Sequence, residues 1–288
     1  MKALRFAALA LAGLIGLASC EKELGPAINF NPAAVDTTYV APVEAATLRR
    51  VLVEEFTGVT CPNCPAGHLI IKNLIEGNPG RISAIGFQPF NIAQANPSKE
   101  TRIDNRTQKG TDLSNTTFGS IPFLPCASID RVKAQNSLLS QPSQWTLKVT
   151  DRMKIAAPMN IDITSTYDST TRELKLKVHM AYTADVTTKN GLTVALVENH
   201  VVDAQESTNT IYDEYDHEHV FRDFLTATAG DAFLNDYPTK TAGRVVDRYF
   251  TYTVDAKWKP ENCVIVAYVH NAETDNIELL QVAEKSLK

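Results

Sequence analysis

Apolar and polar positions in the first half of the chain alternate between strand-like and helix-like spacing. Residues 52–56 and 81–87 are short apolar runs typical of buried strands. Between them, residues 65–76 predict a helix whose apolar face comprises Leu69, Ile70, Leu74 and Ile75. A strand, a helix and a strand in this order predict a parallel crossover.

Two further helices are predicted in the same half. Residues 98–115 form a mostly polar pattern with Ser98 as a possible N-cap, so this helix should lie on the surface. Residues 143–156 follow Pro142 and carry apolar residues at helical spacing. The loop 88–97 follows the carboxyl end of a strand, where it should lie beside the segment after the first strand.

Beyond Pro158 the pattern changes to strand-like alternation. Asn190-Gly191 reads as a turn, and a polar turn covers 271–276. Short turns without long helices predict an all-β antiparallel sandwich. The expected strands are 159–167, 173–183, 192–202, 244–254, 263–270 and 277–283.

Composition narrows the class of protein. The chain has 288 residues, of which 44% are hydrophobic and 21% charged, enough for a sizeable core. About two domains are expected from its length. The formal net charge is −5, and no basic stripe appears, so nucleic acid is not expected as a partner.

The N-terminus has the features of a secretion signal. Lys2 and Arg5 precede an apolar run over 6–17 that is too short for a comfortable membrane span. The run ends in small residues before Cys20 and resembles a bacterial lipobox, which implies a signal peptide over 1–19 and lipidation of Cys20. An ordinary signal peptide with a chance cysteine is the alternative. Residues 20–46 lack periodicity and are expected to be a flexible tether.

The chemically loaded segment is Cys61-Pro62-Asn63-Cys64, which lies between the first strand and the first helix. At a helix N-terminus, Cys61 would be favoured as a thiolate and so as a nucleophile. Pro62 would occupy the first helical turn, and the spacing allows a reversible disulfide. Half of a zinc site or a structural disulfide is the alternative, but no second ligand pair is visible. We expect neither a metal nor another cofactor.

These residues resemble the redox motif of thioredoxin-like proteins. Glu55, six residues before Cys61, matches the family's buried acid, while Thr60 departs from the aromatic residue that thioredoxins carry there. The family also presents a cis-proline opposite the cysteines, for which Pro125 is the better candidate and Pro122 the second. The resemblance implies a thioredoxin-like α/β domain over 47–157, followed by the β-sandwich domain over 158–288.

Cys126 follows this proline directly and has three possible roles. It could be a buried strand cysteine, which behaves as a small hydrophobe. It could also be a third redox thiol or the disulfide partner of Cys263, and the sequence does not choose between these pairings.

The segment 216–219 carries two histidines, His217 and His219, spaced so that a strand would present both on one side. Such a pair would suit a metal, but no third ligand is apparent. A solvated loop that runs into a strand, or polar contacts between domains, is the default interpretation.

The lipobox, the segment 54–68 around the cysteines, the strand after Pro125 and the segment 215–222 together resemble the outer membrane protein twenty-eight lipoproteins of Bacteroidetes. The resemblance implies an outer membrane lipoprotein that is lipid-anchored and faces the periplasm or the surface. One hypothesis is a thiol-disulfide oxidoreductase that acts on envelope thiols or disulfides through Cys61, Cys64, Glu55 and Pro125. The alternative is a non-enzymatic binding or structural lipoprotein whose disulfide staples the helix start. A metal chaperone is a third.

Overall fold

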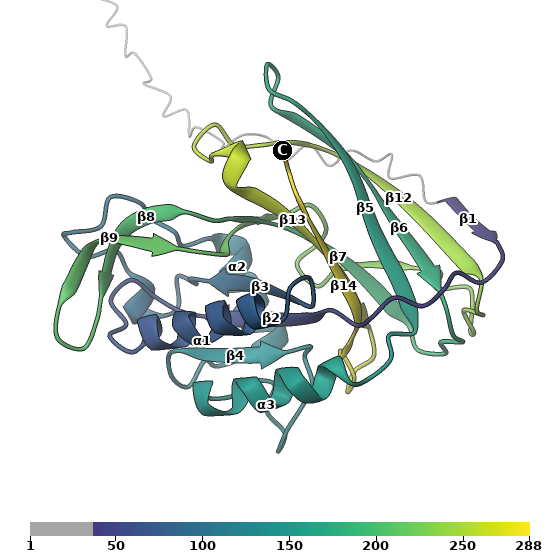
Figure 1. The fold of residues 1–288 in the computed structure, drawn as a ribbon, viewed down its shortest axis with the longest axis horizontal. Helices are drawn as coiled ribbons and strands as arrows, with labels where there is room; N and C mark the ends of the chain where they lie inside the picture. Colours follow the sequence, from purple (N-terminus) through teal and green to yellow (C-terminus); the bar gives the residue numbers. More distant parts are fainter. Residues whose placement is uncertain (1–36) are drawn as a thin grey trace, which may run out of the picture. The chain divides into compact units, whose positions relative to one another are not determined.

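The computed structural model describes residues 37–288, so the expected signal peptide, Cys20 and most of the expected tether lie outside the described residues. Within them, strands outnumber helices (Figure 1). The α-helices are α1 (Cys64–Gly77), α2 (Gln108–Leu113) and α3 (Pro142–Met153), and short 3-10 or π turns lie at Ala93–Ala95, Ser114–Phe118 and Pro260–Asn262. No helix among these residues is long and apolar enough to cross a bilayer.

An eight-stranded sheet runs through both halves of the sequence. Its strand order is β14-β13-β7-β10-β3-β2-β4, with β11 beside β7. The first half supplies β2 (Val51–Phe56), β3 (Ile82–Phe87) and β4 (Cys126–Ile129). The second half supplies β7 (Asn190–Glu198), β10 (Val220–Phe224), β11 (Asp231–Phe233), β13 (Cys263–Asn271) and β14 (Leu279–Ser286). The two sequence halves therefore share one sheet.

Two smaller sheets complete the fold. The four-stranded antiparallel sheet has the order β1-β12-β6-β5, and β8 pairs with β9 as a separate hairpin. The strands are β1 (Thr37–Val40), β5 (Met159–Asp168), β6 (Glu173–Tyr182), β8 (Val201–Glu206), β9 (Ile211–His217) and β12 (Arg244–Thr253). The end of the expected tether is thus the ordered strand β1, which pairs with β12.

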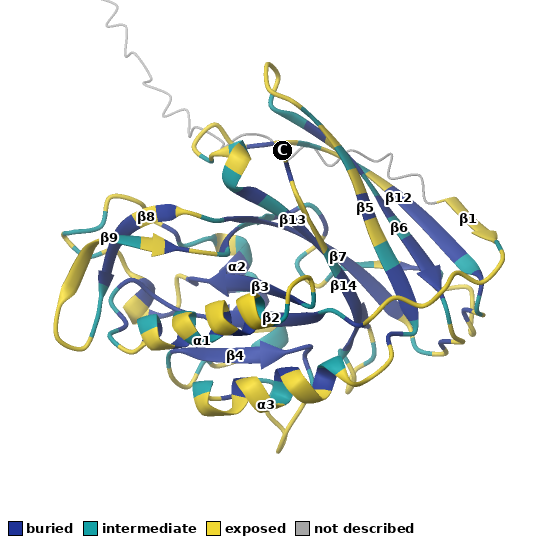
Figure 2. Cartoon of the chain, viewed as in Figure 1, coloured by how far each residue is buried: buried dark blue, intermediate teal, exposed yellow. Residues whose placement is uncertain are grey.

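The predicted crossover is present. β2 and β3 are parallel, and α1 connects them. Every residue of these two strands is buried, as Figure 2 shows in dark blue, because both faces of the sheet are covered. Alternate residues of β2 face opposite sides: Val51 and Val53 pack with α1 and α3, while Leu52 and Phe56 join the other face.

Three apolar clusters cover the two faces of the long sheet. α1 and α3 bury Ile71, Leu74, Trp145 and Val149 against β2, β3 and β4. The four-stranded sheet buries Val178, Met180 and Val246 against Val194 and Ile265 of the long sheet. The third cluster covers the opposite face and combines Phe56 and Phe87 with Phe221 and Tyr268. This cluster extends across the boundary expected at 157–158.

Several local predictions were wrong. In α1, Leu74 is buried and Ile70 and Ile75 pack against the same apolar cluster, as predicted, but Leu69 is 56% exposed and Ile71 is buried instead. The helix expected over 98–115 begins only at Gln108, where the Thr107 side chain accepts a hydrogen bond from Gly110 N and forms the N-cap. Asn190-Gly191 is the start of β7 and not a turn.

Candidate functional site

Cys61 and Cys64 form a disulfide in the turn between β2 and α1, with their Cα atoms 5.4 Å apart. The helix begins at Cys64, whose N–H donates to Cys61 O (3.1 Å), so Cys61 lies just before the helix. Pro65, and not Pro62 as expected, occupies the first helical turn. The disulfide therefore bridges the turn and the first residue of α1.

Both cysteines are enclosed, with Cys61 1% and Cys64 0% exposed. The expected neighbour, loop 88–97, is present: Thr60 donates to Gln94 O through its N–H and its hydroxyl, both at 3.0 Å. The β8–β9 hairpin lies on another side, where Gln205 Nε2 donates to Cys61 O (3.1 Å). Figure 1 shows this hairpin beside the start of α1. Sequence reasoning missed the hairpin, because its contact with the cysteines spans about half of the chain.

Glu55 lies on the face of β2 that α1 covers, and it is 4% exposed. Its Oε1 atom has no hydrogen-bond partner among the described residues. Burial raises the pKa of this carboxyl well above its usual range, so the protonated form is favoured. A buried acid beside the cysteine turn is the arrangement expected for Glu55.

Pro125 precedes β4, and the Leu124–Pro125 peptide bond is cis, as predicted for this proline. The ring packs against Gly67, one turn into α1 after Cys64. A Cβ atom on Gly67 would lie 2.9 Å from Pro125 Cγ and 3.1 Å from Glu55 Oε1. Gly67 thus lets Pro125 and Glu55 meet the start of α1, which brings the predicted site residues together.

His68 is a member of the site that sequence reasoning missed. Its Nε2 lies 2.9 Å from Thr57 Oγ1 and 3.7 Å from Glu55 Oε2, and its Nδ1 lies 2.8 Å from Tyr215 Oη. Burial, with His217 and His219 nearby, lowers the pKa of His68 to about 3, so the ring is neutral at physiological pH. Its position four residues after Cys64, on the same helical face, was the available signal.

A small cavity of about 10 Å³ adjoins Glu55 and His68, about the volume that one water molecule needs. Gln88 at the end of β3 and His217 at the end of β9 also line it. The Oε1 atom of Gln88, like that of Glu55, has no hydrogen-bond partner among the described residues. The cavity thus adjoins two residues with buried, unpaired acceptor oxygens.

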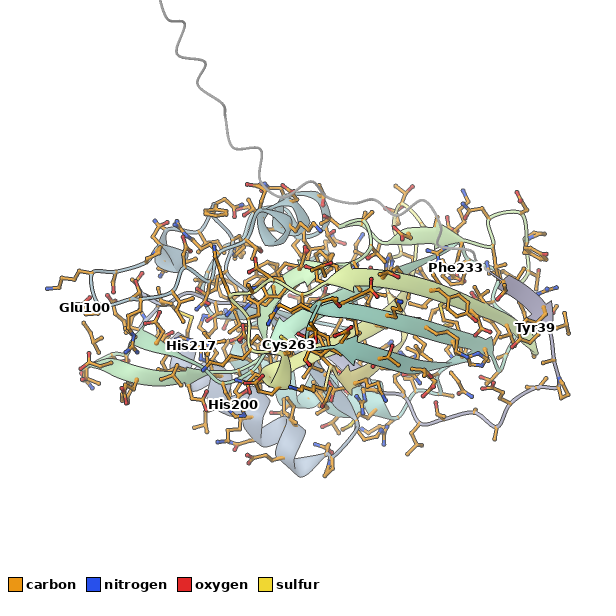
Figure 3. The ribbon with its side chains drawn as sticks, turned by 90° about the horizontal axis from the view of Figure 1, so that it is seen from above. Tyr39, Glu100, His200, His217, Phe233 and Cys263 are labelled. Carbon is orange, nitrogen blue, oxygen red and sulfur yellow. A yellow bond between two sulfur atoms is a disulfide. The ribbon has the colours of Figure 1, made fainter. Side chains whose placement is uncertain are left out.

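The histidines of segment 216–219 do not form the same-side strand pair that a metal site would use. His217 ends β9 and is 3% exposed, whereas His219 has φ 57° in the turn before β10, so the strand alternation stops between them. In Figure 3, His217 lies on the opposite side of Cys263 from Tyr39 of β1.

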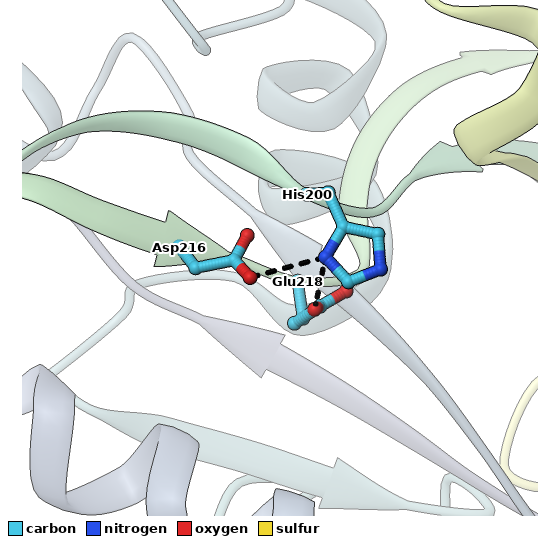
Figure 4. Close-up of side chains that lie close together, drawn as sticks. All are labelled: His200, Asp216 and Glu218. Carbon is cyan, nitrogen blue, oxygen red and sulfur yellow. Dashed lines mark hydrogen bonds and ion pairs between the residues drawn. The ribbon is translucent and has the colours of Figure 1, made fainter.

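Three exposed groups beside this segment form an ion-pair cluster. His200 Nδ1 lies 3.0 Å from both Asp216 Oδ2 and Glu218 Oε1 (Figure 4). The hydrogen bond to Asp216, together with the charge of Glu218, raises the pKa of His200. Among the described residues, these three are the one group of three or more His, Cys, Asp or Glu side chains whose ligand-type atoms all lie within 4.8 Å of one another. Attraction between the imidazole and the two carboxylates accounts for the arrangement.

Cys126 and Cys263 are free and buried in their strands. Burial raises the pKa of each thiol to about 12, so both remain protonated. Of the three roles considered for Cys126, the buried strand cysteine is the one that the structure supports, because it lies in the apolar cluster of Phe56 and Phe87.

Comparison with known families decides the relationship. The model of the family described as Outer membrane protein Omp28 matches residues 114–288. The chain belongs to this family. The match confirms the resemblance found in the sequence, and membership supports an outer membrane location. No curated protein matches the chain.

Solved structures show the fold more completely. HBP35 of Porphyromonas gingivalis is similar with a TM-score of 0.67 at 19% identity, over 84% of this chain and 76% of its own. A protein of Agrobacterium tumefaciens has a TM-score of 0.52 at 13% identity, over 85% of this chain and 97% of its own. A domain of the outer membrane lipoprotein Omp28 from Porphyromonas gingivalis, at 22% identity, aligns over 44% of this chain and 86% of its own with a TM-score of 0.30.

Proposed function

We propose that this Omp28-family protein is a thiol-disulfide oxidoreductase of the cell envelope, with residues 47–157 as a thioredoxin-like module. The observation that carries the proposal is Glu55, a buried carboxyl with an unpaired oxygen, which meets Pro125 at the start of the helix that bears Cys64. A disulfide that only fixes the start of α1 needs no such acid. Because leaving a buried acceptor unpaired costs about 1–3 kcal/mol, a role for Glu55 beyond structure is favoured.

The chemistry follows from the positions of the groups. A thiolate of a dithiol partner attacks Cys61 Sγ and forms a mixed disulfide, and the Cys61–Cys64 bond breaks with its electron pair on Cys64. The Glu55 carboxyl supplies the proton that Cys64 then needs. The partner's second thiolate attacks its own sulfur in the mixed disulfide and releases Cys61. The partner loses two electrons and the protein gains them; the reverse sequence oxidises the protein.

Pro125 supports this cycle by its place in the chain. Proline has no N–H, and the carbonyl of Leu124 before it can accept a hydrogen bond from the backbone of a bound peptide. The partner class is therefore an envelope protein that presents a thiol or a disulfide in an extended segment.

One observation favours a second function. Cys61 is 1% exposed, so a partner's sulfur reaches it only if loop 88–97 or the β8–β9 hairpin moves. An enclosed disulfide suits a binding or structural lipoprotein in which the bond only fixes the start of α1. The β-rich part would then carry the interaction.

The reduction potential of the Cys61–Cys64 pair separates the two functions. A value between about −120 and about −270 mV supports exchange, whereas a value below about −300 mV supports the staple. The Cys64→Ala variant should also accumulate mixed disulfides through Cys61 in envelope extracts, and Cys61→Ala is the matched control. The oxidoreductase proposal fails if neither variant forms adducts.

Anchoring is a separate part of the proposal. The small residues before Cys20 support lipidation of its thiol and amino group, which would fix the protein to a leaflet without a spanning segment. A clickable fatty-acid label should mark the wild type and not Cys20→Ser. Protease treatment of intact cells then distinguishes a surface-facing protein, which is cut, from a periplasmic one, which is protected.

A further inference from the structure

Glu55 must exchange a proton with solvent in every redox cycle, yet its carboxyl is enclosed by β2, α1 and Pro125. This inference rests on the proposed function and concerns the route of that proton. Within the described residues no hydrogen bond to the Glu55 carboxyl is present, so the route requires another group.

His68 lies between the enclosed acid and solvent. Its side chain is 20% exposed, while its Nε2 is 3.7 Å from Glu55 Oε2. That distance is too long for a direct hydrogen bond, so a proton that passes between the two groups needs an intermediate group. The cavity that Glu55 and His68 both line is about the size of one water.

The cavity also has the polarity that a water requires. A water donates two hydrogen bonds, and Glu55 and Gln88 each have a buried oxygen that lacks a donor. Thr57 Oγ1 lines the same cavity and lies 2.9 Å from His68 Nε2, which adds a group that can donate or accept. A single water there would satisfy both oxygens, and the Thr57 hydroxyl would connect that water to His68 Nε2.

Tyr215 fixes the imidazole from the other side. Its hydroxyl lies 2.8 Å from His68 Nδ1, and the two rings are 5.6 Å apart. A neutral imidazole accepts a hydrogen bond at one nitrogen and donates at the other. With Tyr215 at Nδ1 and Thr57 at Nε2, both nitrogens are engaged, so the ring is held in one orientation.

We propose that His68 transfers the Glu55 proton to and from solvent through one water in this cavity and the Thr57 hydroxyl, and that Tyr215 holds His68 in position for the transfer. When the disulfide is reduced, Glu55 gives a proton to Cys64 and regains one from solvent through His68; oxidation reverses the flow. The β8–β9 hairpin, which belongs to the β-rich half, therefore supplies part of the redox site.

The test measures the rates of disulfide reduction by dithiothreitol and of reoxidation by oxidised dithiothreitol. His68→Gln keeps a hydrogen-bonding side chain but cannot relay a proton, so both rates should fall by about 10²-fold. They should fall by the same factor, because a relay changes barriers and leaves the equilibrium potential unchanged. A structural role would change the potential or the melting temperature instead.

Tyr215→Phe is the second variant, since it removes only the hydroxyl. It should slow both directions less than His68→Gln, and Tyr212→Phe, on the same hairpin but 46% exposed, should leave both rates unchanged. If both His68→Gln and Tyr215→Phe react at the wild-type rates, the relay is overturned while the proposed oxidoreductase function stands. If dithiothreitol does not reduce the Cys61–Cys64 disulfide of the wild type, the proposed function falls, and the relay with it.

Discussion

Gly67 of α1 and Pro125 before β4 are in such close contact that a Cβ atom on Gly67 would lie 2.9 Å from Pro125 Cγ. Gly67→Ala should therefore destabilise the protein by about 1–3 kcal/mol through overpacking. This loss should exceed the gain of about 1 kcal/mol that alanine gives in a helix. Denaturant unfolding measures the difference.

Gly77 provides the matched control in the same helix. A Cβ atom there meets nothing within 4 Å, so Gly77→Ala should stabilise the protein by up to about 1 kcal/mol. If Gly67→Ala were as stable as Gly77→Ala, the contact with Pro125 would not constrain this position.

The second prediction concerns a buried ion pair that joins β2 to the segment after β4. Arg131 donates to both carboxylate oxygens of Glu54, at 2.8 and 2.7 Å, and also to Tyr268 Oη at 2.9 Å. Arg131→Met leaves the Glu54 charge buried and should cost about 3–5 kcal/mol. The exposed pair of Lys72 and Glu76 is the control, where Lys72→Met should change stability by less than about 0.5 kcal/mol. Equal losses in the two variants would contradict this account.

The third prediction is a pH dependence at His179. Burial alone would lower its pKa, but hydrogen bonds to Glu44 and Asp247 outweigh burial, and the pKa is raised above 6.5. A histidine with a raised folded-state pKa contributes stability that is complete below the unfolded value and is lost as pH rises through the folded value. Stability should therefore decline from 6.5 upward, through the raised pKa.

His179→Gln is the variant that tests this prediction. It should be less stable than the wild type at about pH 5.5 and closer to it at about pH 8.5, because the charged imidazole has gone. Unfolding curves at both pH values measure the gap between the two proteins. A gap that does not narrow with rising pH would show that the pair with Glu44 and Asp247 adds no pH-dependent stability.

The fourth prediction concerns the free thiols. Cys126 and Cys263 are buried, and burial raises the pKa of both to about 12, so iodoacetamide should label neither in the native protein. Both should react once guanidinium unfolds the chain. Mass spectrometry of the labelled peptides gives the result. Labelling of Cys126 in the native protein would instead support its role as a third redox thiol.

Local sequence patterns predicted the parts of the fold that depend on neighbouring residues. The crossover from β2 through α1 to β3 follows from apolar runs and helical spacing. The proline before β4 could be selected because proline is tolerated at the first position of a strand. Glu55 was identified by its resemblance to a known motif, and burial then explains its raised pKa.

Contacts between distant segments were not predictable in this way. β9 and β10 have no strong alternation of their own, and β10 is held by pairing with β7 and β3. β1 is polar enough to read as linker, but pairing with β12 orders it. His68 has an ordinary place on a helix; its partner Tyr215 is 147 residues away, and no local pattern encodes that contact.

Gly86 of β3 pairs with Val220 of β10, so an exported chain can complete its sheet only after the second half of the sequence has emerged. A chain that has emerged only as far as residue 200 contains both cysteines, Glu55 and Pro125. It still lacks β10, which covers the edge of β3, and His217, which lines the cavity beside Glu55. Such contacts form late because their loops are long. A prematurely ended or clipped chain would therefore carry the disulfide while the edge of β3 is uncovered and open to pairing with wrong partners.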